Sequence, residues 1–168
     1  SMNLRHYKEW KDTDAVETLV MFLDTVLSDF IKTLESLRDS SDEQKRSAFY
    51  FMQRGYKFAK EHRALGLGVL GWHTFLQENN IAFEDKEAFE LNKEIFKLIE
   101  EKAYKASKDL AKEYGEPELL KGYGRRNTTL LAVAPTTSSA FILGQVSQSI
   151  EPVMSNCFVK DVDKMKVT

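Results

Sequence analysis

Residues 133–144, VAPTTSSAFILG, contain the residue types that could bind a phosphate group. The β-branched and apolar run before Pro135 predicts a buried strand over 128–134, and the next apolar residues predict a short helix over 139–144. The first N–H groups of a helix have no partner within it and lie at the positive end of its dipole. A loop over 135–139 could therefore bind an anion. Its hydroxyl side chains are consecutive: Thr136, Thr137, Ser138 and Ser139.

Two interpretations fit this loop on composition alone. In the first, hydroxyl and backbone N–H groups together hold a phosphate. No lysine lies in the loop, so it is not a Walker A loop and neutral donors must hold the anion. In the second, one of the Ser or Thr residues only caps the short helix.

A second stretch, ALGLGVLGWH, contains Gly66, Gly68 and Gly71 at the G-x-G-x-x-G spacing of dinucleotide-binding loops. That use requires a hydrophobic strand just before the first glycine, but the preceding KFAKEHRAL is charged and has a helical pattern. Glu84 and Asp85 lie at the distance expected of a ribose-binding acid, but at the start of a predicted helix. We therefore favour a packing role, in which glycine lets a helix or turn press close against a neighbouring backbone.

Net charge, cysteine and histidine content, and the length of apolar runs argue against nucleic-acid-binding, metal-binding and membrane-spanning proteins. The 168 residues carry a net charge of −2, which gives no overall attraction to nucleic acid or anionic membrane. Cys157 is the sole cysteine and is expected to be a small core residue, and His6, His62 and His73 show no metal-ligand spacing. No apolar run is long enough to span a bilayer, and no signal peptide is recognisable. A cytoplasmic protein without a metal site is expected.

Apolar spacing predicts a mostly helical chain with one or two short strands. Asp14 with Glu17, and Ser41 with Gln44, resemble capping boxes at the starts of the first two helices. A second short strand is expected over 157–162. The helices expected besides the one over 139–144 cover 14–39, 42–60, 64–78 and 85–114.

Four motifs in order resemble the large, catalytic subunit of ribonucleotide reductases. The segment RRNTTLLAVAPTTSSAFILGQVSQSIEPVMSN is similar to that family's R-N-S-x-L-x-A-x-x-P-T, short helix, S-I-E-P stretch. RALGLGVLGWHTFL resembles R-x-I-G-L-G-V-M-G, EKAYKASKDLAKEYG resembles A-S-x-E-L-A-K-E-x-G, and NLRHY resembles the I-N-L that follows a cysteine motif. The resemblance covers essentially the whole chain.

This resemblance implies a piece from the C-terminal half of the family's ten-stranded α/β barrel domain. By position, Thr136, Thr137, Ser138 and Ser139 would bind the substrate's phosphates, Glu151 and Pro152 would be structural, and the three glycines would lie in a packed helical segment. The family's radical-bearing cysteine, its reducing cysteines and its radical-relay tyrosines have no counterpart in the chain. No catalytic residue is therefore assigned, and the chain alone is expected to be inactive.

The resemblance also implies partners for the whole enzyme, which makes deoxyribonucleotides for DNA synthesis. These are a ribonucleoside diphosphate, the remainder of the large subunit, a metal-containing small subunit that generates the radical, and a thioredoxin- or glutaredoxin-type reductant. ATP and deoxynucleoside triphosphates would act as effectors, and no cofactor is expected on this piece itself. A different hypothesis is a stand-alone helical module that binds an anion or a protein partner through the same loop.

Overall fold

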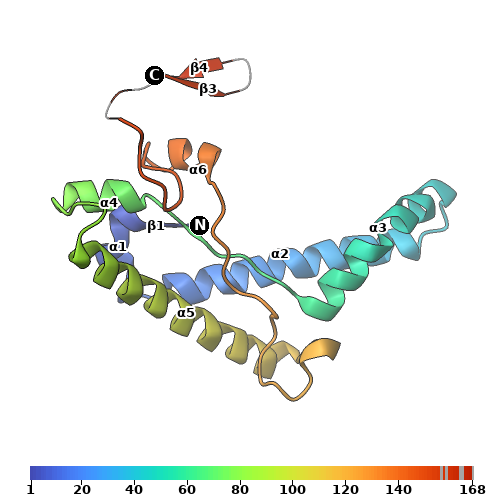
Figure 1. Cartoon of the computed structure of the whole chain (residues 1–168). Helices are drawn as coiled ribbons and strands as arrows, with labels where there is room; N and C mark the ends of the chain where they lie inside the picture. The colour runs from blue at the N-terminus through green and yellow to red at the C-terminus, as the bar shows by residue number, and fades with distance from the viewer. Residues whose placement is uncertain (156, 158, 163–164, 168) are drawn as a thin grey trace. The chain divides into compact units, whose positions relative to one another are not determined.

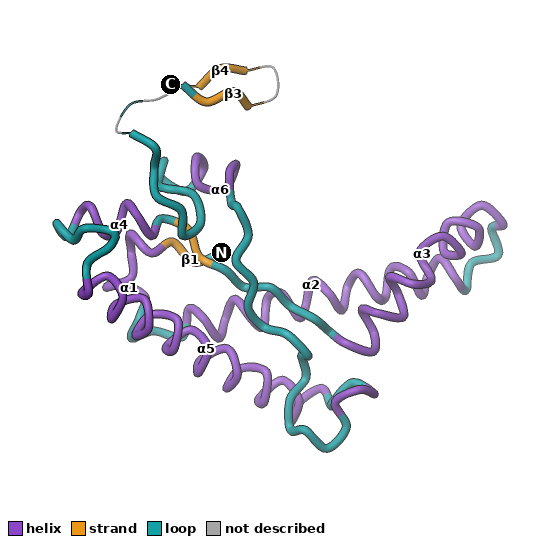
Figure 2. Tube along the Cα trace, viewed as in Figure 1, coloured by secondary structure: helices purple, strands orange, loops and turns teal. Residues whose placement is uncertain are grey.

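The computed structural model describes residues 1–155, 157, 159–162 and 165–167, which divide into two compact units (Figure 1). The unit that we call the helical unit comprises residues 8–67 and 92–132. The unit that we call the loop unit comprises residues 1–7, 68–91 and 133–168. Helices account for most of the described residues, and the strands are short (Figure 2).

The helical unit is built on an antiparallel helix pair, α2 (Ala15–Arg38) and α3 (Glu43–His62). Helix α5 (Lys86–Tyr114) begins among residues of the loop unit and continues through the helical unit, followed by the 3-10 turn η2 (Glu118–Leu120). These helices correspond to those expected over 14–39, 42–60 and 85–114, and their ends differ from expectation by at most two residues.

The helix caps differ from the two expected capping boxes. Asp14 makes no side-chain cap on α2; instead the Thr13 hydroxyl accepts a hydrogen bond from Ala15 N–H at 3.3 Å. Asp42, rather than Ser41, caps α3 by accepting from Gln44 N–H at 2.8 Å. Asp42 has the extended backbone of an N-cap residue, which places its carboxylate over the first turn.

The core of the helical unit lies along one stripe of α2 and one stripe of α5. Each fully buried aliphatic side chain of such a stripe contributes about 1.5–3 kcal/mol to the free energy of folding. As a separate finding, none of the helices that the structure describes is apolar enough over a sufficient length to cross a membrane. The buried residues of these stripes include Val16, Val20, Ile31 and Leu34 on α2, and Ile95, Ile99, Ala103 and Leu110 on α5.

The glycine stretch is not helical, so the helix expected over 64–78 is wrong in its first half. Helix α4 covers only Trp72–Glu78. Before it, strand β2 (Val69–Leu70) pairs in parallel with β1 (Met2–Asn3), whose Met2 N–H donates to the Gly68 carbonyl at 2.8 Å. These backbone groups are paired with a distant part of the chain, which a helix would not allow.

The strand expected over 128–134 is reduced to an isolated parallel bridge between Leu67 and Leu131. Leu67 N–H donates to the Leu130 carbonyl at 2.8 Å, and Ala132 N–H donates to the Leu67 carbonyl at 3.1 Å. A Cβ atom on Gly66 would lie only 3.0 Å from the Cβ of Ala132. Gly66 therefore permits a close backbone approach, as the packing interpretation requires, but in an unwound segment rather than a helix.

The loop unit gathers β1, β2, α4 and helix α6 (Thr137–Ile142), with the 3-10 turn η1 (Leu4–His6) and the start of α1 (Tyr7–Trp10). Leu70, Ala140 and Val146 form a buried cluster in it. Strand β3 (Lys160–Val162) pairs antiparallel with β4 (Met165–Val167). β3 falls within the second expected strand, 157–162, of which residue 158 lies outside the described residues.

Two glycines with contrasting surroundings give a test of this fold. Gly71 has φ +82°, and a Cβ there would lie 3.0 Å from Asn3 Oδ1, whereas a Cβ on the helical Gly55 would meet nothing within 4 Å. We expect Gly71→Ala to lower the free energy of unfolding by at least about 1–2 kcal/mol. Gly55→Ala should raise it by about 0.5–1 kcal/mol. Urea denaturation followed by circular dichroism measures both, and a Gly71→Ala chain as stable as the native one would contradict the backbone described here.

Candidate functional site

The four hydroxyl residues lie at the start of α6, but the helix begins earlier than expected. It covers Thr137–Ile142, so the short helix expected over 139–144 and the separate loop over 135–139 are both corrected. Thr136 is the N-cap residue with a left-handed backbone, φ 55°, and the other three form the first helical turn. At Thr136 the chain turns into α6, and the N–H groups of the first turn point away from the rest of the helix.

Two of the four hydroxyls bind other parts of the loop unit. The Thr136 hydroxyl accepts from Ser149 N–H at 2.8 Å, and the Thr137 hydroxyl donates to Gln148 Oε1 at 3.1 Å. Both threonines are partly buried, whereas Ser138 and Ser139 are exposed. Ser138 and Ser139 are therefore the hydroxyls best placed to meet a ligand from solution.

Residues 147–149 also cap helix α4. Its N-cap residue is Gly71, which has no side chain, and residues 147–149 supply acceptors for N–H groups at the start of the helix instead. Gly71 N–H donates to the Ser147 carbonyl at 2.8 Å, Trp72 N–H to the Ser149 carbonyl at 3.3 Å, and Thr74 N–H to Ser147 Oγ at 3.1 Å. Ser147 and Ser149 are buried, and neither was identified from the sequence.

This capping argues against a dinucleotide site at the glycines. A pyrophosphate would need the free N–H groups at the start of the helix that follows the third glycine. Here Gly71, Trp72 and Thr74 have already donated theirs to residues 147–149. Helix α3, not a strand, precedes the first glycine by only a few residues, as the charged pattern of KFAKEHRAL indicated.

The other residues singled out in the sequence have ordinary surroundings. His73 Nδ1 accepts from Val153 N–H at 3.0 Å, and His62 stacks on Phe58. Cys157 is exposed, so its expected place in a core is wrong. Among the described residues, no three His, Cys, Asp or Glu side chains lie close enough to hold a metal ion. Glu151 and Pro152 are exposed in the turn after residue 149.

A second polar cluster, in the helical unit, was missed by the sequence analysis. Asp24 is only 3% exposed, and its Oδ1 accepts from Arg63 Nε and Asn127 Nδ2, each at 2.9 Å. Its Oδ2 lies 2.8 Å from Arg63 Nη2 and accepts from Arg126 Nε at 3.0 Å. Asn127 Oδ1 in turn accepts from the buried Ser107 hydroxyl at 2.8 Å. One carboxylate therefore joins α2, the end of α3, α5 and the segment at Arg126.

The charge of Asp24 is stabilised by these neighbours. Burial by itself would raise the pKa of the Asp24 carboxyl, but the hydrogen bonds from Arg63 and Arg126 outweigh burial and hold that pKa below its ordinary value. Every polar atom of the carboxylate has a protein partner, so we assign the cluster a structural role.

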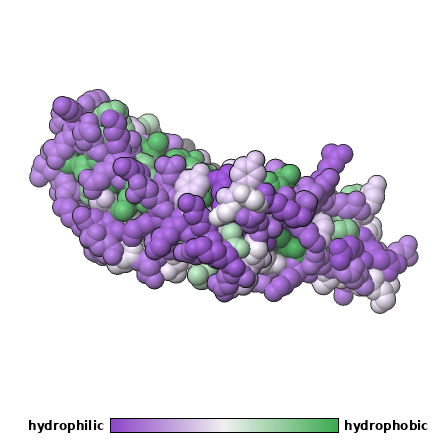
Figure 3. All heavy atoms as spheres, turned by 90° about the horizontal axis from the view of Figure 1, so that it is seen from below, coloured by the Kyte–Doolittle hydropathy of each residue, from purple (hydrophilic) through white to green (hydrophobic). Residues whose placement is uncertain are grey.

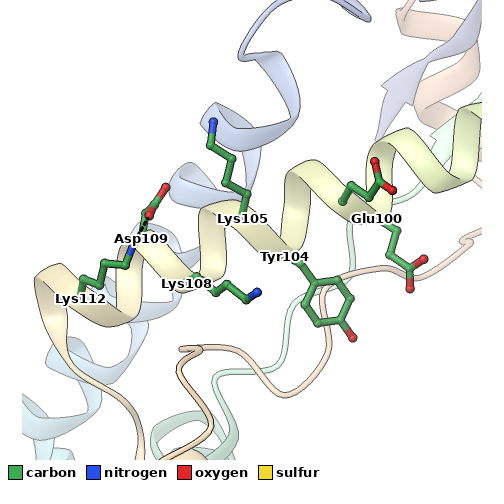
Figure 4. Close-up of a pocket in the computed structure, with 7 residues that line it drawn as sticks. Glu100, Tyr104, Lys105, Lys108, Asp109 and Lys112 are labelled. Carbon is green, nitrogen blue, oxygen red and sulfur yellow. Dashed lines mark hydrogen bonds and ion pairs between the residues drawn. The ribbon is translucent and has the colours of Figure 1, made fainter.

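A hollow along α5 has charged walls but no converging donors. Glu100, Tyr104, Lys105, Lys108 and Lys112 line it from a single helix, and Figure 4 shows their side chains fanning outward along that helix. Lys112 Nζ donates to Asp109 Oδ1 at 2.9 Å, which lowers the pKa of that exposed carboxyl. This is the geometry of a solvated helix face.

Comparison with known proteins identifies relatives over nearly the whole chain. A model of the ribonucleotide reductase barrel domain matches residues 2–120 and 117–168. A Frog virus 3 (isolate Goorha) protein named for the ribonucleoside-diphosphate reductase large subunit is 41% identical over 159 residues, which cover 95% of this chain and 26% of that protein. The ribonucleoside-diphosphate reductase large subunit of Invertebrate iridescent virus 6 is 37% identical over 162 residues, 96% of this chain and 15% of that protein.

A solved structure agrees with these relatives. The alpha subunit of the Actinobacillus ureae class Id ribonucleotide reductase is 55% identical and superposes with a TM-score of 0.82 over 93% of this chain. The match takes in 28% of that subunit. The chain thus spans between 15% and 28% of the length of these three proteins.

Removing the charge at the centre of the buried cluster tests its importance. We expect Asp24→Asn to lower the free energy of unfolding by about 3–5 kcal/mol, because Arg63 and Arg126 would be left without a counter-charge. Asp109→Asn is the matched control, since Asp109 is exposed and pairs with Lys112 on its own helix, and it should leave stability unchanged within error. Chemical denaturation at neutral pH compares the two; equal stability of all three chains would refute the structural role.

The same carboxylate sets a pH dependence. The pKa of the Asp24 carboxyl is lowered in the folded chain. Its charge therefore contributes fully to the free energy of unfolding at pH values above the unfolded-state pKa of about 3.9, and this contribution is lost as the pH falls through the folded-state pKa. We expect the native chain to lose stability below about pH 4 more steeply than Asp24→Asn does. Parallel acid titrations of the two chains would refute this link.

Proposed function

The chain belongs to the ribonucleotide reductase family, within its barrel domain, and we propose that it supplies the substrate-phosphate site of a ribonucleoside-diphosphate reductase large subunit. In this proposal Thr136, Thr137, Ser138 and Ser139 bind the phosphates of a ribonucleoside diphosphate. The observation that carries it is the position of these four residues at the start of α6, where their hydroxyls coincide with the first-turn N–H groups that a helix leaves without an acceptor inside it.

The chemistry of such a site is positioning. A phosphate held at α6 would fix where the ribose lies, which lowers the entropic cost of the reaction. No cationic side chain lies in the loop, so donors of neutral hydrogen bonds supply the affinity. The exposed Ser138 and Ser139 reach the ligand first, and Thr137 joins them if its hydroxyl leaves Gln148.

The complete reaction is proposed for the whole subunit, not for this chain. We expect the whole enzyme to work with a radical-generating, metal-containing small subunit, a thioredoxin- or glutaredoxin-type reductant, and ATP and deoxynucleotide effectors, in the cytoplasm. Reduction of the ribose with a thiyl radical and a dithiol needs three cysteines, and this chain has one, the exposed Cys157. The chain by itself is therefore proposed to be inactive.

The alternative, a stand-alone helical module, is less consistent with the surface. Helix α6 leaves Ile142 80% exposed, and Phe51 on α3 is also 80% exposed. Figure 3 shows apolar side chains reaching a mostly hydrophilic surface. Helix α3 exposes four large apolar side chains, Tyr50, Phe51, Met52 and Phe58, and this concentration on one helix supports a surface that a larger barrel would cover.

Nucleotide titration tests the phosphate site. We expect cytidine diphosphate to shift the backbone amide signals of Thr136 to Ser139 in a 15N NMR spectrum of the chain, because the phosphate would bind their N–H groups. Cytidine without phosphates is the control and should leave them unchanged. Ser138→Ala together with Ser139→Ala should weaken binding by roughly tenfold, from two lost hydrogen bonds of about 0.5–1.5 kcal/mol each. Shifts confined to Gly66–Gly71 would overturn the assignment.

Self-association, measured by analytical ultracentrifugation, distinguishes a piece of a barrel from a stand-alone module. A piece of a barrel should self-associate through its uncovered apolar surface, and Ile142→Ser should reduce that association. Tyr123→Ser is the matched control, because Tyr123 is 71% exposed but lies in a turn outside α6. A native chain that stays monomeric at every concentration would favour the stand-alone module.

A further inference from the structure

Helix α4 takes its N-terminal cap from a segment that follows it by about 70 residues in the chain. In a capping box, the N-cap hydroxyl accepts from the N–H of the third helical residue, whose side chain returns the bond. Here Thr74 is the third residue of α4, and Ser147 occupies the place of the capping residue, because Gly71 has no side chain. Thr74 N–H donates to Ser147 Oγ at 3.1 Å, and Ser147 N–H donates to Thr74 Oγ1 at 2.8 Å.

The pair fixes both the position and the direction of residues 147–149. Its two hydrogen bonds set the Ser147 backbone against the first turn of α4, and Gly71 N–H adds a third through the Ser147 carbonyl at 2.8 Å. Ser147 is 3% exposed, so its N–H cannot turn to water if the Thr74 hydroxyl is removed. Val146, the preceding residue, packs with Leu70 and Ala140 in the buried cluster.

The same segment holds the start of α6. Ser149 N–H donates to the Thr136 hydroxyl at 2.8 Å, and Gln148 Oε1 accepts from the Thr137 hydroxyl at 3.1 Å. Thr136 has φ 55°, a backbone conformation that β-branched residues rarely adopt and that persists only where the surroundings impose it. The bond from Ser149 is a direct restraint on that residue.

We propose that Thr74 is a positioning residue for the phosphate site: through its reciprocal bond with Ser147 it holds residues 147–149, which hold Thr136 and Thr137 at the start of α6. The inference rests on the proposed function of Thr136 to Ser139. Thr74 itself touches no ligand. The Thr136 hydroxyl accepts the bond from Ser149 N–H, and its own O–H can still donate to the ligand beside the first-turn N–H groups and the hydroxyls of the following residues.

Three substitutions in the full chain test this role, with pyrophosphate as the probe. Thr74→Val keeps the shape of the side chain but removes the hydroxyl, and we expect it to weaken pyrophosphate binding roughly tenfold, because the buried Ser147 N–H loses its acceptor and residues 147–149 lose a restraint. Thr74→Ser keeps the hydroxyl and should bind within about twofold of the native chain. Thr25→Val is the matched control: it removes a threonine hydroxyl bonded to the Met21 carbonyl in α2, and should bind as the native chain does. Calorimetry gives each dissociation constant.

If Thr74 had a purely structural role, Thr74→Val would lower the stability of the chain, but pyrophosphate affinity would not fall in Thr74→Val and recover in Thr74→Ser. Native affinity in Thr74→Val overturns the inference, and so does failure of Thr74→Ser to restore binding. If Thr74→Val does not fold, Ser147→Ala replaces it; that variant should also weaken binding, and native affinity in it overturns the inference. Absence of pyrophosphate binding by the native chain would overturn the proposed function itself, an outcome separate from normal binding in Thr74→Val.

Discussion

The buried carboxylate of Asp24 is the interaction on which the helical unit depends. A charge removed from water is tolerated only when partners replace its hydration, and here two guanidinium groups and one amide do so. Those partners are Arg63 at the end of α3, and Arg126 and Asn127 at the start of the segment that leads toward α6. The same carboxylate therefore holds the end of one helix next to the beginning of that segment. Asn127 Nδ2 also donates to the Arg63 carbonyl at 3.0 Å, which sets the two unwound segments side by side from their first residues.

The alignment at Asn127 explains why the glycine stretch is not a helix. Once residues 63 and 127 are joined, the following residues of both segments run in parallel, and their N–H and carbonyl groups pair at the bridge between Leu67 and Leu131. A Cβ at Gly66 would lie only 3.0 Å from the Cβ of Ala132 on the other segment, and Gly71 is needed because the chain turns through a positive φ into α4. Two of the three glycines in the G-x-G-x-x-G spacing, Gly66 and Gly71, thus answer two separate steric requirements of the fold.

The sequence predicts what local pattern controls and misses what distant contacts control. Helices α2, α3 and α5 follow from apolar spacing, because each buries one stripe. The helix wrongly expected at 64–71 and the strand reduced to one bridge both depend on pairing across some 60 residues. Asp24 left a signal that went unused: it lies four residues after Val20 on the buried stripe of α2, where an acid requires a partner. Ser147 and Ser149 left none, since nothing near them in the sequence indicates α4.

Residues 147–149, which hydrogen-bond to both α4 and the start of α6, explain how neutral groups could hold a phosphate. A lysine or arginine attracts the anion over several ångströms, so its placement need not be exact to contribute. A hydroxyl or amide gains only about 0.5–1.5 kcal/mol over water, and that gain disappears if the group must first be ordered. A site of four hydroxyl residues without a cation therefore binds only if its donors are oriented beforehand. In this chain Ser149 N–H restrains the left-handed Thr136 and Thr74 restrains Ser147, so the affinity that we propose for the site depends on these residues as well as on those that would contact the phosphate.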